Sequence, residues 1–324
     1  MRAITRICLG AGIVAITIGA VAQQFTTVQQ LTNREMFLRF SAPVGTNYRI
    51  DIATNFPADT NLARWSALLT ARSAGVNQHT DSAAPYLPTR FYRAEQLTNS
   101  PVLTGDHIAT TNGDVVIRWA GHASFAMSWN GKIILNDPTN TAGFTSLPLA
   151  DLILVSHHHN DHFNPSTLAS LIGPSGKIVV PPFVYTTNTF ASLQSKAINL
   201  TYGQSTNVQG ITIEAVPAYN GNHPYGINNA YVITIGGKRF FTGGDCGDGP
   251  EIRGLTNIEV AFLAMNLPFT TNAHGATNII RHMRPRIVYP YHYRNSGGQL
   301  TNAPTFKQWL GQDLGIEVRL RPWY

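Results

Sequence analysis

The chain has 324 residues, of which 43% are apolar and 12% are charged, a composition that excludes a disordered polyelectrolyte and a coiled coil. Its length allows one large domain or two moderate ones, and two cysteines are too few for a disulfide scaffold. The formal net charge is +6, but the arginines are scattered along the chain, so we expect no nucleic-acid partner.

The first 22 residues are typical of an export signal. Arg2 and Arg6 precede the apolar run 7–20, and the small residues of Ala20-Val21-Ala22 suit a signal peptidase. A single membrane anchor is the alternative, but the run is shorter than the roughly 20 residues that a span needs. The sequence therefore predicts an exported, periplasmic or extracellular protein that begins near Gln23 and has no stable membrane span.

Residues 28–97 are rich in Thr, Asn, Ala and aromatic residues and predict a small all-β module. The predicted strands are Met36–Ser41, Tyr48–Ala53, Arg64–Thr70 and Arg90–Ala94, and turns rich in Pro, Gly and Asn separate them. The pattern from Trp65 to Arg93 resembles a small β module of exported bacterial proteins, which implies a spacer or a binding module without activity. The segment Thr98–Asp106 is rich in Thr, Asn, Ser, Pro and Gly, which predicts a linker.

Residues 107–324 predict a second domain, because β-like runs alternate there with helical patterns, as in α/β proteins. Asn130-Gly131 is a strong hairpin signal between two strand-like runs. The predicted strands are Val115–Trp119, Phe125–Trp129, Lys132–Leu135, Leu152–Ser156, Lys177–Val180, Ile211–Val216, Tyr231–Ile235, Lys238–Thr242, Val260–Ala264, Ile287–Tyr289 and Glu317–Leu320. The predicted helices are Pro165–Ile172, Val184–Leu193, Ala273–Met283 and Thr305–Leu314.

Four histidines and an aspartate gather in residues 157–162. If the strand continues from Leu152 through Ser156, His157 and His159 project from one face and can chelate a metal ion. Asn164 as N-cap and Pro165 as first helical residue would begin a helix immediately afterwards. Asp161 and His162 then lie in the loop, where they can hold a second ion.

Histidine with carboxylate is the ligand set of catalytic zinc sites, whereas closed structural sites favour thiolates. The alternative is that these side chains are surface polar groups or helix caps. Because the order H-x-H-x-D-H is highly specific for a short motif, metal binding is the stronger interpretation.

The H-x-H-x-D-H motif resembles that of the metallo-β-lactamase superfamily, which implies an αββα sandwich and a metal-dependent hydrolase. Gly121-His122-Ala123-Ser124 and Asn136-Asp137-Pro138 resemble the opening hairpin of the branch that includes ascorbate-phosphate lactonase and N-acylphosphatidylethanolamine phospholipase D. Gly243-Gly244-Asp245 resembles the motif whose aspartate bridges two metals, and the segment 289–293 resembles the closing motif in which His292 is a ligand.

One landmark departs from the family pattern. The superfamily usually places a histidine directly after Pro-Ala-x, but here Asn220 follows Pro217-Ala218-Tyr219 and His223 comes three residues later. Either His223 turns back to the first ion, or that ion lacks a ligand and Asn220 takes the place. We favour His223, because a neutral imidazole is a better zinc ligand than an amide.

The resemblance implies two divalent ions, zinc with manganese as the alternative, and a metal-bound hydroxide as nucleophile. We expect Asp161 also to orient this hydroxide and move its proton. His122 either polarises the substrate or only bonds to backbone. The residues expected to bind the ions are His157, His159, His223, Asp161, His162 and His292, with Asp245 as the bridge.

The expected substrate is a lactone, an ester or a phosphodiester of small-molecule size. Two other functions stay open, namely a non-catalytic binding module on this fold and an iron redox protein of the flavodiiron type. The sequence leaves the oligomeric state undetermined. By strand alternation, His158 is expected to point away from the ions, and the same is expected of Cys246 because it follows the bridging aspartate.

Overall fold

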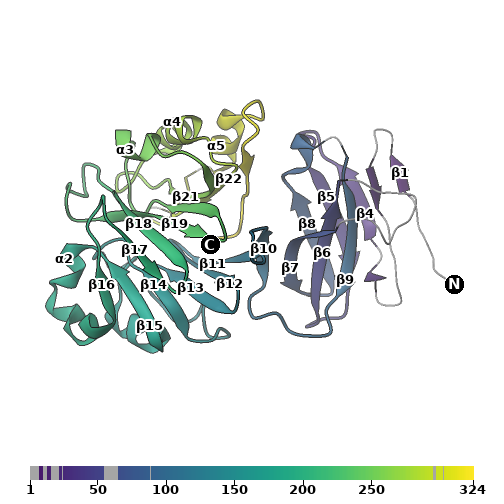
Figure 1. Ribbon diagram of the computed structural model, residues 1–324. Coiled ribbons are helices and arrows are strands. Elements are labelled where there is room, and N and C mark those ends of the chain that lie inside the picture. The colour runs from purple at the N-terminus through teal and green to yellow at the C-terminus, as the bar shows by residue number, and fades with distance from the viewer. Residues whose placement is uncertain are drawn as a thin grey trace. The chain divides into compact units, whose positions relative to one another are not determined.

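The computed structural model describes residues 25–54, 65–87, 89–294, 297–301 and 303–324, together with three short N-terminal strands. Two compact units make up the chain, Met1–Ala109 and Thr110–Tyr324 (Figure 1). Inside the predicted signal lie β1 (Ile7–Leu9), β2 (Ile13–Ala15) and the first residue of β3 (Ala22–Gln23). The rest of that segment, and Arg64 of a predicted strand, lie outside the described residues.

The first unit is built from β-strands, as its composition predicts. Its remaining strands are β4 (Phe25–Gln30), β5 (Met36–Ser41), β6 (Asn47–Ala53), β7 (Ser66–Arg72), β8 (Val76–Asp81), β9 (Phe91–Gln96) and β10 (Gly105–Ile108). An antiparallel sheet has the order β4-β5-β8, and a second sheet has the order β9-β6-β7-β10, with β2 and β3 paired to β9. Phe40, Tyr48 and Tyr92 lie in the apolar core of this unit.

The second unit contains two mixed sheets. The first has the order β11 (Val115–Gly121), β12 (Ser124–Trp129), β13 (Lys132–Asn136), β14 (Ala150–Leu154), β15 (Ile172–Val180) and β16 (Ala197–Asn199). The second has the order β17 (Ser205–Val208), β18 (Ile211–Pro217), β19 (Asn229–Ile235), β20 (Lys238–Thr242), β21 (Ile258–Ala264), β22 (Ile287–Tyr291) and β23 (Glu317–Val318). In both sheets the later strands run parallel.

The two sheets pack face to face through aromatic side chains. The rings of Phe125 on β12 and Phe262 on β21 stack with centroids 4.0 Å apart, and the Tyr231 hydroxyl on β19 donates to the carbonyl of Val155. The helices are α1 (Pro165–Leu171), α2 (Pro182–Tyr185), α3 (Pro250–Arg253), α4 (Ala273–Met283) and α5 (Ala303–Leu310), with a 3-10 helix, η3, at Asn188–Lys196. In Figure 1, α3, α4 and α5 lie over the second sheet, and α2 lies beside the outer strands of the first. The predicted αββα sandwich is confirmed.

Two predicted helices are wrong in extent. The helix predicted for Val184–Leu193 is replaced by α2 and η3, because Thr187 between them is extended and its hydroxyl bonds to the Val184 carbonyl. The helix predicted for Thr305–Leu314 ends at Leu310, because Gly311 takes a left-handed conformation with φ +70°. No helix among the described residues is long and apolar enough to cross a membrane.

Candidate metal centre

The histidine-rich segment follows β14 at the carboxyl end of the parallel strands. The strand ends at Leu154, so the prediction that it continues through Ser156 and carries His157 and His159 is wrong. The chain turns instead, and the amides of His162 and Phe163 both donate to the carbonyl of His159. The predicted helix start is confirmed, because Asn164 caps α1 with its side chain and Pro165 is the first helical residue.

His157, His159, His223 and Asp245 form the first group of possible ligands. Nδ1 of His159 lies 3.1 Å from Nε2 of His157 and 3.1 Å from Nε2 of His223. Oδ2 of Asp245 lies 3.3 Å from Nε2 of His223 and 3.8 Å from Nε2 of His157. The loops after three different strands therefore bring four donor atoms to one point.

A second group forms on the other oxygen of the same aspartate. Oδ1 of Asp245 lies 3.1 Å from Nε2 of His162 and 3.4 Å from Nε2 of His292. Oδ2 of Asp161 lies 3.4 Å from His292 Nε2 and 3.8 Å from His162 Nε2. His122 adds a third imidazole, with Nε2 3.0 Å from Asp161 Oδ2. One carboxylate thus faces both groups.

The donor atoms fit divalent ions in spacing and in chemistry. Atoms bound at about 2.0–2.1 Å to tetrahedral zinc lie about 3.4 Å from one another, and those of both groups are separated by similar distances. His162 Nε2, His292 Nε2 and Asp245 Oδ1 are buried and have no hydrogen-bond partner. Buried polar atoms are rarely left unpaired. Ions held by these atoms would satisfy all three.

The charges of the site also suit cations. Burial, together with the positive charge of His162, lowers the pKa of His157 well below its usual value, so its imidazole is the neutral form that binds metal. Burial opposes a charge on His162, but the carboxylates of Asp245 and Asp137 raise its pKa well above the ordinary value. Burial would raise the pKa of Asp245, but His162 and His292 hold it far below its usual range. These carboxylates therefore stabilise positive charge between them.

Further polar side chains hold the ring orientations. Asp137 accepts hydrogen bonds from the amide and hydroxyl of Ser156, and its Oδ2 lies 2.8 Å from Nδ1 of His162. The Ser156 hydroxyl also lies 3.0 Å from Nδ1 of His157. Asn266 contacts Nδ1 of His292. Such contacts fix which ring nitrogen remains free for a metal.

Asn220 and His223 occupy different places in the site. The side-chain oxygen of Asn220 lies 3.1 Å from Nδ1 of His223, whose Nε2 belongs to the first group. The side-chain nitrogen Nδ2 of Asn220 donates to the backbone carbonyls of Asp245 and Phe269. The structure thus brings His223 to the first group and leaves Asn220 behind it, as a support.

His122 bonds to the backbone of other residues, and its ring also contacts side chains of the site. Its backbone amide bonds to Trp323 and its carbonyl accepts from the amide of His292, while its ring contacts Asp161 and Nδ1 lies 2.8 Å from the hydroxyl of Tyr324. No sequence motif predicted the contact of Tyr324 with His122. No short motif links residues so far apart, so only the fold reveals it.

His158 and Cys246 lie outside both groups. The ring of His158 packs on Phe183 with centroids 4.6 Å apart. Burial raises the pKa of the Cys246 thiol to about 12, and the side chain belongs to the apolar core of the second unit. A thiol in that setting is inert.

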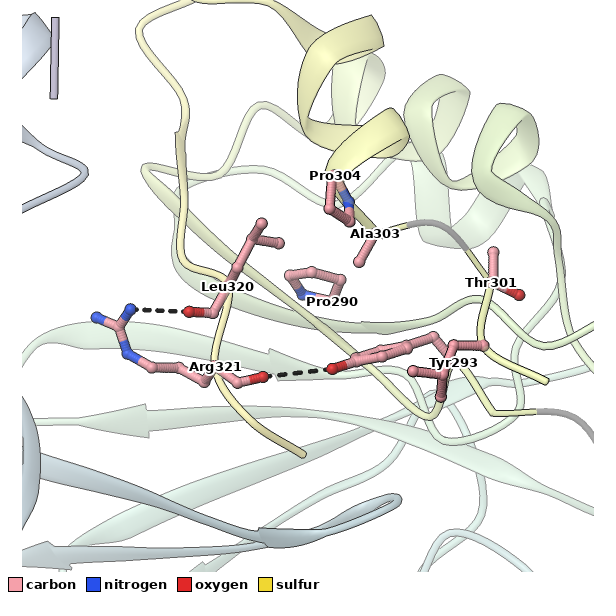
Figure 2. A pocket seen from close by; sticks show the side chains of 8 residues that line it. Pro290, Tyr293, Thr301, Ala303, Pro304, Leu320 and Arg321 are labelled. Atoms are coloured by element: carbon pink, nitrogen blue, oxygen red, sulfur yellow. Dashed lines mark hydrogen bonds between the residues drawn. The ribbon is translucent and has the colours of Figure 1, made fainter. Parts of the chain in front are cut away.

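A cavity of about 470 Å³ opens onto the two groups. It is lined by His122, His159, Asp161, Asp245, Asn266, Phe269 and Arg294. A separate cavity of about 450 Å³ is lined in part by Pro290, Tyr293 and Leu320, and none of the described residues in its wall carries an imidazole or a carboxylate (Figure 2). There the hydroxyl of Tyr293 donates to the carbonyl of Arg321. The substrate of a metal centre belongs in the first cavity.

Known proteins that are similar to this chain include metal-dependent hydrolases. Residues 116–292 match the family model described as "Beta-lactamase superfamily domain". The chain is similar to a UPF0173 metal-dependent hydrolase of Thermus thermophilus, with 29% identity over 220 residues that cover 63% of this chain and 94% of the relative. A UPF0173 metal-dependent hydrolase of Pyrococcus abyssi is 27% identical over 64% of this chain and 97% of its own length.

A solved structure extends this similarity to the fold. A protein of Parabacteroides distasonis, described as a metal-dependent hydrolase, is 32% identical, with a TM-score of 0.59. The match covers 67% of this chain and 97% of the other.

Proposed function

Because the chain belongs to the metallo-β-lactamase superfamily and is one of its metal-dependent hydrolases, we propose that it is an exported enzyme that binds two zinc ions and cleaves a lactone, an ester or a phosphodiester. The observation that carries the two-ion proposal is the Asp245 carboxylate, whose Oδ2 faces one group of histidines and whose Oδ1 faces the other. Manganese is the alternative metal.

The proposed ligands follow the two groups. His157, His159 and His223 would hold the first ion, Asp161, His162 and His292 the second, and Asp245 both. Divalent ions held there would lower the pKa of a water to about 7 and polarise the scissile carbonyl or phosphoryl oxygen. No serine or cysteine nucleophile is then required.

Asp161 is placed to handle protons in this reaction. Its side chain is 47% exposed and lines the cavity, while its Oδ2 contacts both His122 and His292. A carboxylate at the boundary between ligands and solvent can orient the attacking water and accept its proton. His122, held by Tyr324, fixes the position of that carboxylate and can pass the proton to a leaving group.

The export part of the proposal rests on residues 1–22 alone, whose charged start, apolar run and small final residues suit a cleaved signal. Antibody detection after cell fractionation tests it. We expect a product shortened by about 22 residues outside the cytoplasm. A full-length product in the cytoplasm would contradict it.

Metal content and turnover test the chemistry. The mature chain is purified, its metals are measured by mass spectrometry, and lactones, esters and phosphodiesters are offered as substrates. We expect close to two zinc or manganese ions per chain and turnover of one of these classes. Iron would favour a redox protein of the flavodiiron type, and no metal after reconstitution would favour a non-catalytic binding module.

A further inference from the structure

Arg294 lines the cavity of the metal centre without belonging to either group of possible ligands. It comes two residues after His292, past the end of β22, and shares the cavity wall with Asp161, Asp245 and Phe269. Arg294 therefore borders the space where a substrate would lie over the two groups.

An aromatic ring holds the Arg294 guanidinium in place. Its Cζ lies 4.5 Å from the centroid of the Tyr324 ring, a cation–π arrangement. The Tyr324 hydroxyl accepts a hydrogen bond from the Arg294 amide and lies 2.8 Å from Nδ1 of His122. Tyr324 thus contacts both the guanidinium of Arg294 and the His122 imidazole, which itself lies beside Asp161.

The guanidinium lacks an acidic partner among the described residues. Three other arginines of the second unit have one, since Arg253 pairs with Asp248, Arg239 with Glu214 and Arg286 with Glu259. Among the described residues, the Arg294 guanidinium instead packs on the ring of Tyr324. Stacking occupies the face of a guanidinium and leaves its in-plane N–H donors available.

We propose that Arg294 determines specificity by binding an anionic group, a carboxylate or a phosphate, that the substrate carries beside its scissile bond. The planar N–H donors of arginine match both anions in a two-pronged arrangement. Bound cations would make the cavity still more attractive to an anion. This inference rests on the proposed hydrolase function, because it assigns a substrate class to the same cavity.

Turnover of two matched esters gives the first test. The probes are mono-4-nitrophenyl adipate, which carries a carboxylate too distant to attack its own ester readily, and its uncharged methyl ester. Arg294→Ala should lower kcat/KM for the charged ester about 10- to 100-fold more than for the methyl ester, mainly through KM. Arg294→Lys should restore part of the difference. Arg286→Ala, which removes an arginine that does not line the cavity, is the matched control and should change kcat/KM for neither ester.

Binding gives a second test that needs no turnover. Calorimetry with the zinc-loaded protein compares acetate, which can reach only the ions, with succinate and 3-phosphonopropionate, whose second anionic group can reach Arg294. Arg294→Ala should weaken the binding of the longer anions about 10- to 100-fold more than the binding of acetate. The tighter longer anion identifies the preferred group.

The outcomes separate the two proposals. If Arg294→Ala lowers the affinity for acetate and for the longer anions equally, or lowers none of them, the proposed role of Arg294 is wrong. If no ester is cleaved but the difference between succinate and acetate depends on Arg294, the hydrolase proposal fails in its substrate class and the anion site stands.

Discussion

At the scale of single residues, the two oxygens of Asp245 are the link between the two groups of ligands. Asp245→Asn keeps the shape of the side chain but removes its charge and one acceptor oxygen. We expect the variant to bind fewer than about one ion per chain and to lose hydrolysis by about a thousandfold or more, because the bridging charge is lost. Mass spectrometry and initial rates measure both effects.

Asp248→Asn is the matched control for this prediction. Asp248 is close in the chain but contacts Arg253 and Asn278 instead of the histidines. Metal content at the wild-type level in the Asp245 variant would refute the bridging role, provided that circular dichroism shows an intact fold.

Asn220 is predicted to act on the metal through His223. Asn220→Ala removes the acceptor at Nδ1 of His223 and the two hydrogen bonds to the carbonyls of Asp245 and Phe269. Loss of such a supporting contact typically lowers metal affinity about 10- to 100-fold, and we expect that range from competition with a chelator. Asn207→Ala, on β17, is the control, because this side chain accepts from the amide of Gly210 and contacts none of the ligands. An unchanged affinity would mean that the Asn220 side chain does not orient His223.

The departure from the family pattern at Asn220 shows what spacing alone could not decide. Asn220 accepts from the amides of Asn222 and His223, and this local turn carries His223 back to the first group. A sequence gives the ligand type and the order along the chain, but the path of a four-residue loop depends on hydrogen bonds that form only in the folded site.

The buried pair of Asp81 and Arg90 makes the first unit sensitive to acid. Burial would raise the pKa of Asp81, but Arg90 and the hydroxyl of Tyr92 outweigh it, and the pKa lies below its ordinary value of 3.8. Because the folded-state pKa is the lower one, the stabilisation is complete above the unfolded value and is lost as pH falls below it. Calorimetry should show this loss as the pH falls through 3.8 and below.

Asp81→Asn should remove that dependence. At pH 7 the variant should lose about 3 kcal/mol of unfolding free energy, because a buried ion pair is broken, and its transition should shift less with acid than that of the wild type. Parallel shifts in both proteins would contradict the assignment to Asp81.

At the scale of elements, the ends of β14 and β20 meet at a position that only glycine suits. Gly244 follows β20 with φ +50°, and a Cβ there would lie 2.7 Å from the Cβ of Ser156, which follows β14. Gly244→Ala should displace Ser156 from Asp137, His157 and His162. We expect weaker metal binding, by about tenfold or more, with a stability loss of about 1–3 kcal/mol.

Gly221→Ala serves as the comparison, because a Cβ at Gly221 meets no atom within 4 Å. If both variants bind metal like the wild type, the close approach of the two loops does not hold the site together.

The strands and helices were predictable where the local pattern is strong. Asn130-Gly131 forms the predicted hairpin with positive φ at both residues, and α4 has the predicted bounds Ala273–Met283. The strands β4 and β8 were not predicted, because their residues are mostly polar and they form a sheet through pairing with β5. Strand pairing of this kind is decided by partners distant in sequence.

Within the candidate site, the sequence predicted the motif residues better than their supports. The residues of the H-x-H-x-D-H motif, with Asp245, His223 and His292, lie together as expected. Tyr324 and Arg294 carry no motif of their own. Tyr324 contacts both His122 and Arg294 because the end of the chain returns to the opening hairpin. Only the three-dimensional path of the chain places them.

At the scale of the whole molecule, the candidate metal centre lies entirely within the unit Thr110–Tyr324. The curated relatives described above match about 63–64% of this chain and nearly all of their own length. We therefore expect residues 110–324 to fold alone, bind the same number of ions and keep kcat/KM within about threefold of the full chain, because every ligand and support remains.

The deletion is judged first by its solubility and its unfolding transition. A soluble second unit without turnover would show that the first unit contributes to catalysis. Loss of all soluble protein would contradict the prediction that the first unit is a separable module, and the small β module would then be required for folding.

The buried thiol of Cys246 can be used to measure how often the core of the second unit opens. Of the two cysteines, it is the one whose side chain the structure describes, and it is fully buried beside Asp245. A thiol reagent can react with it only after the surrounding core opens, so the labelling rate measures how often that happens under native conditions. Ions that bind only the closed form should slow the labelling in proportion to their affinity, which makes metal binding measurable without any substrate.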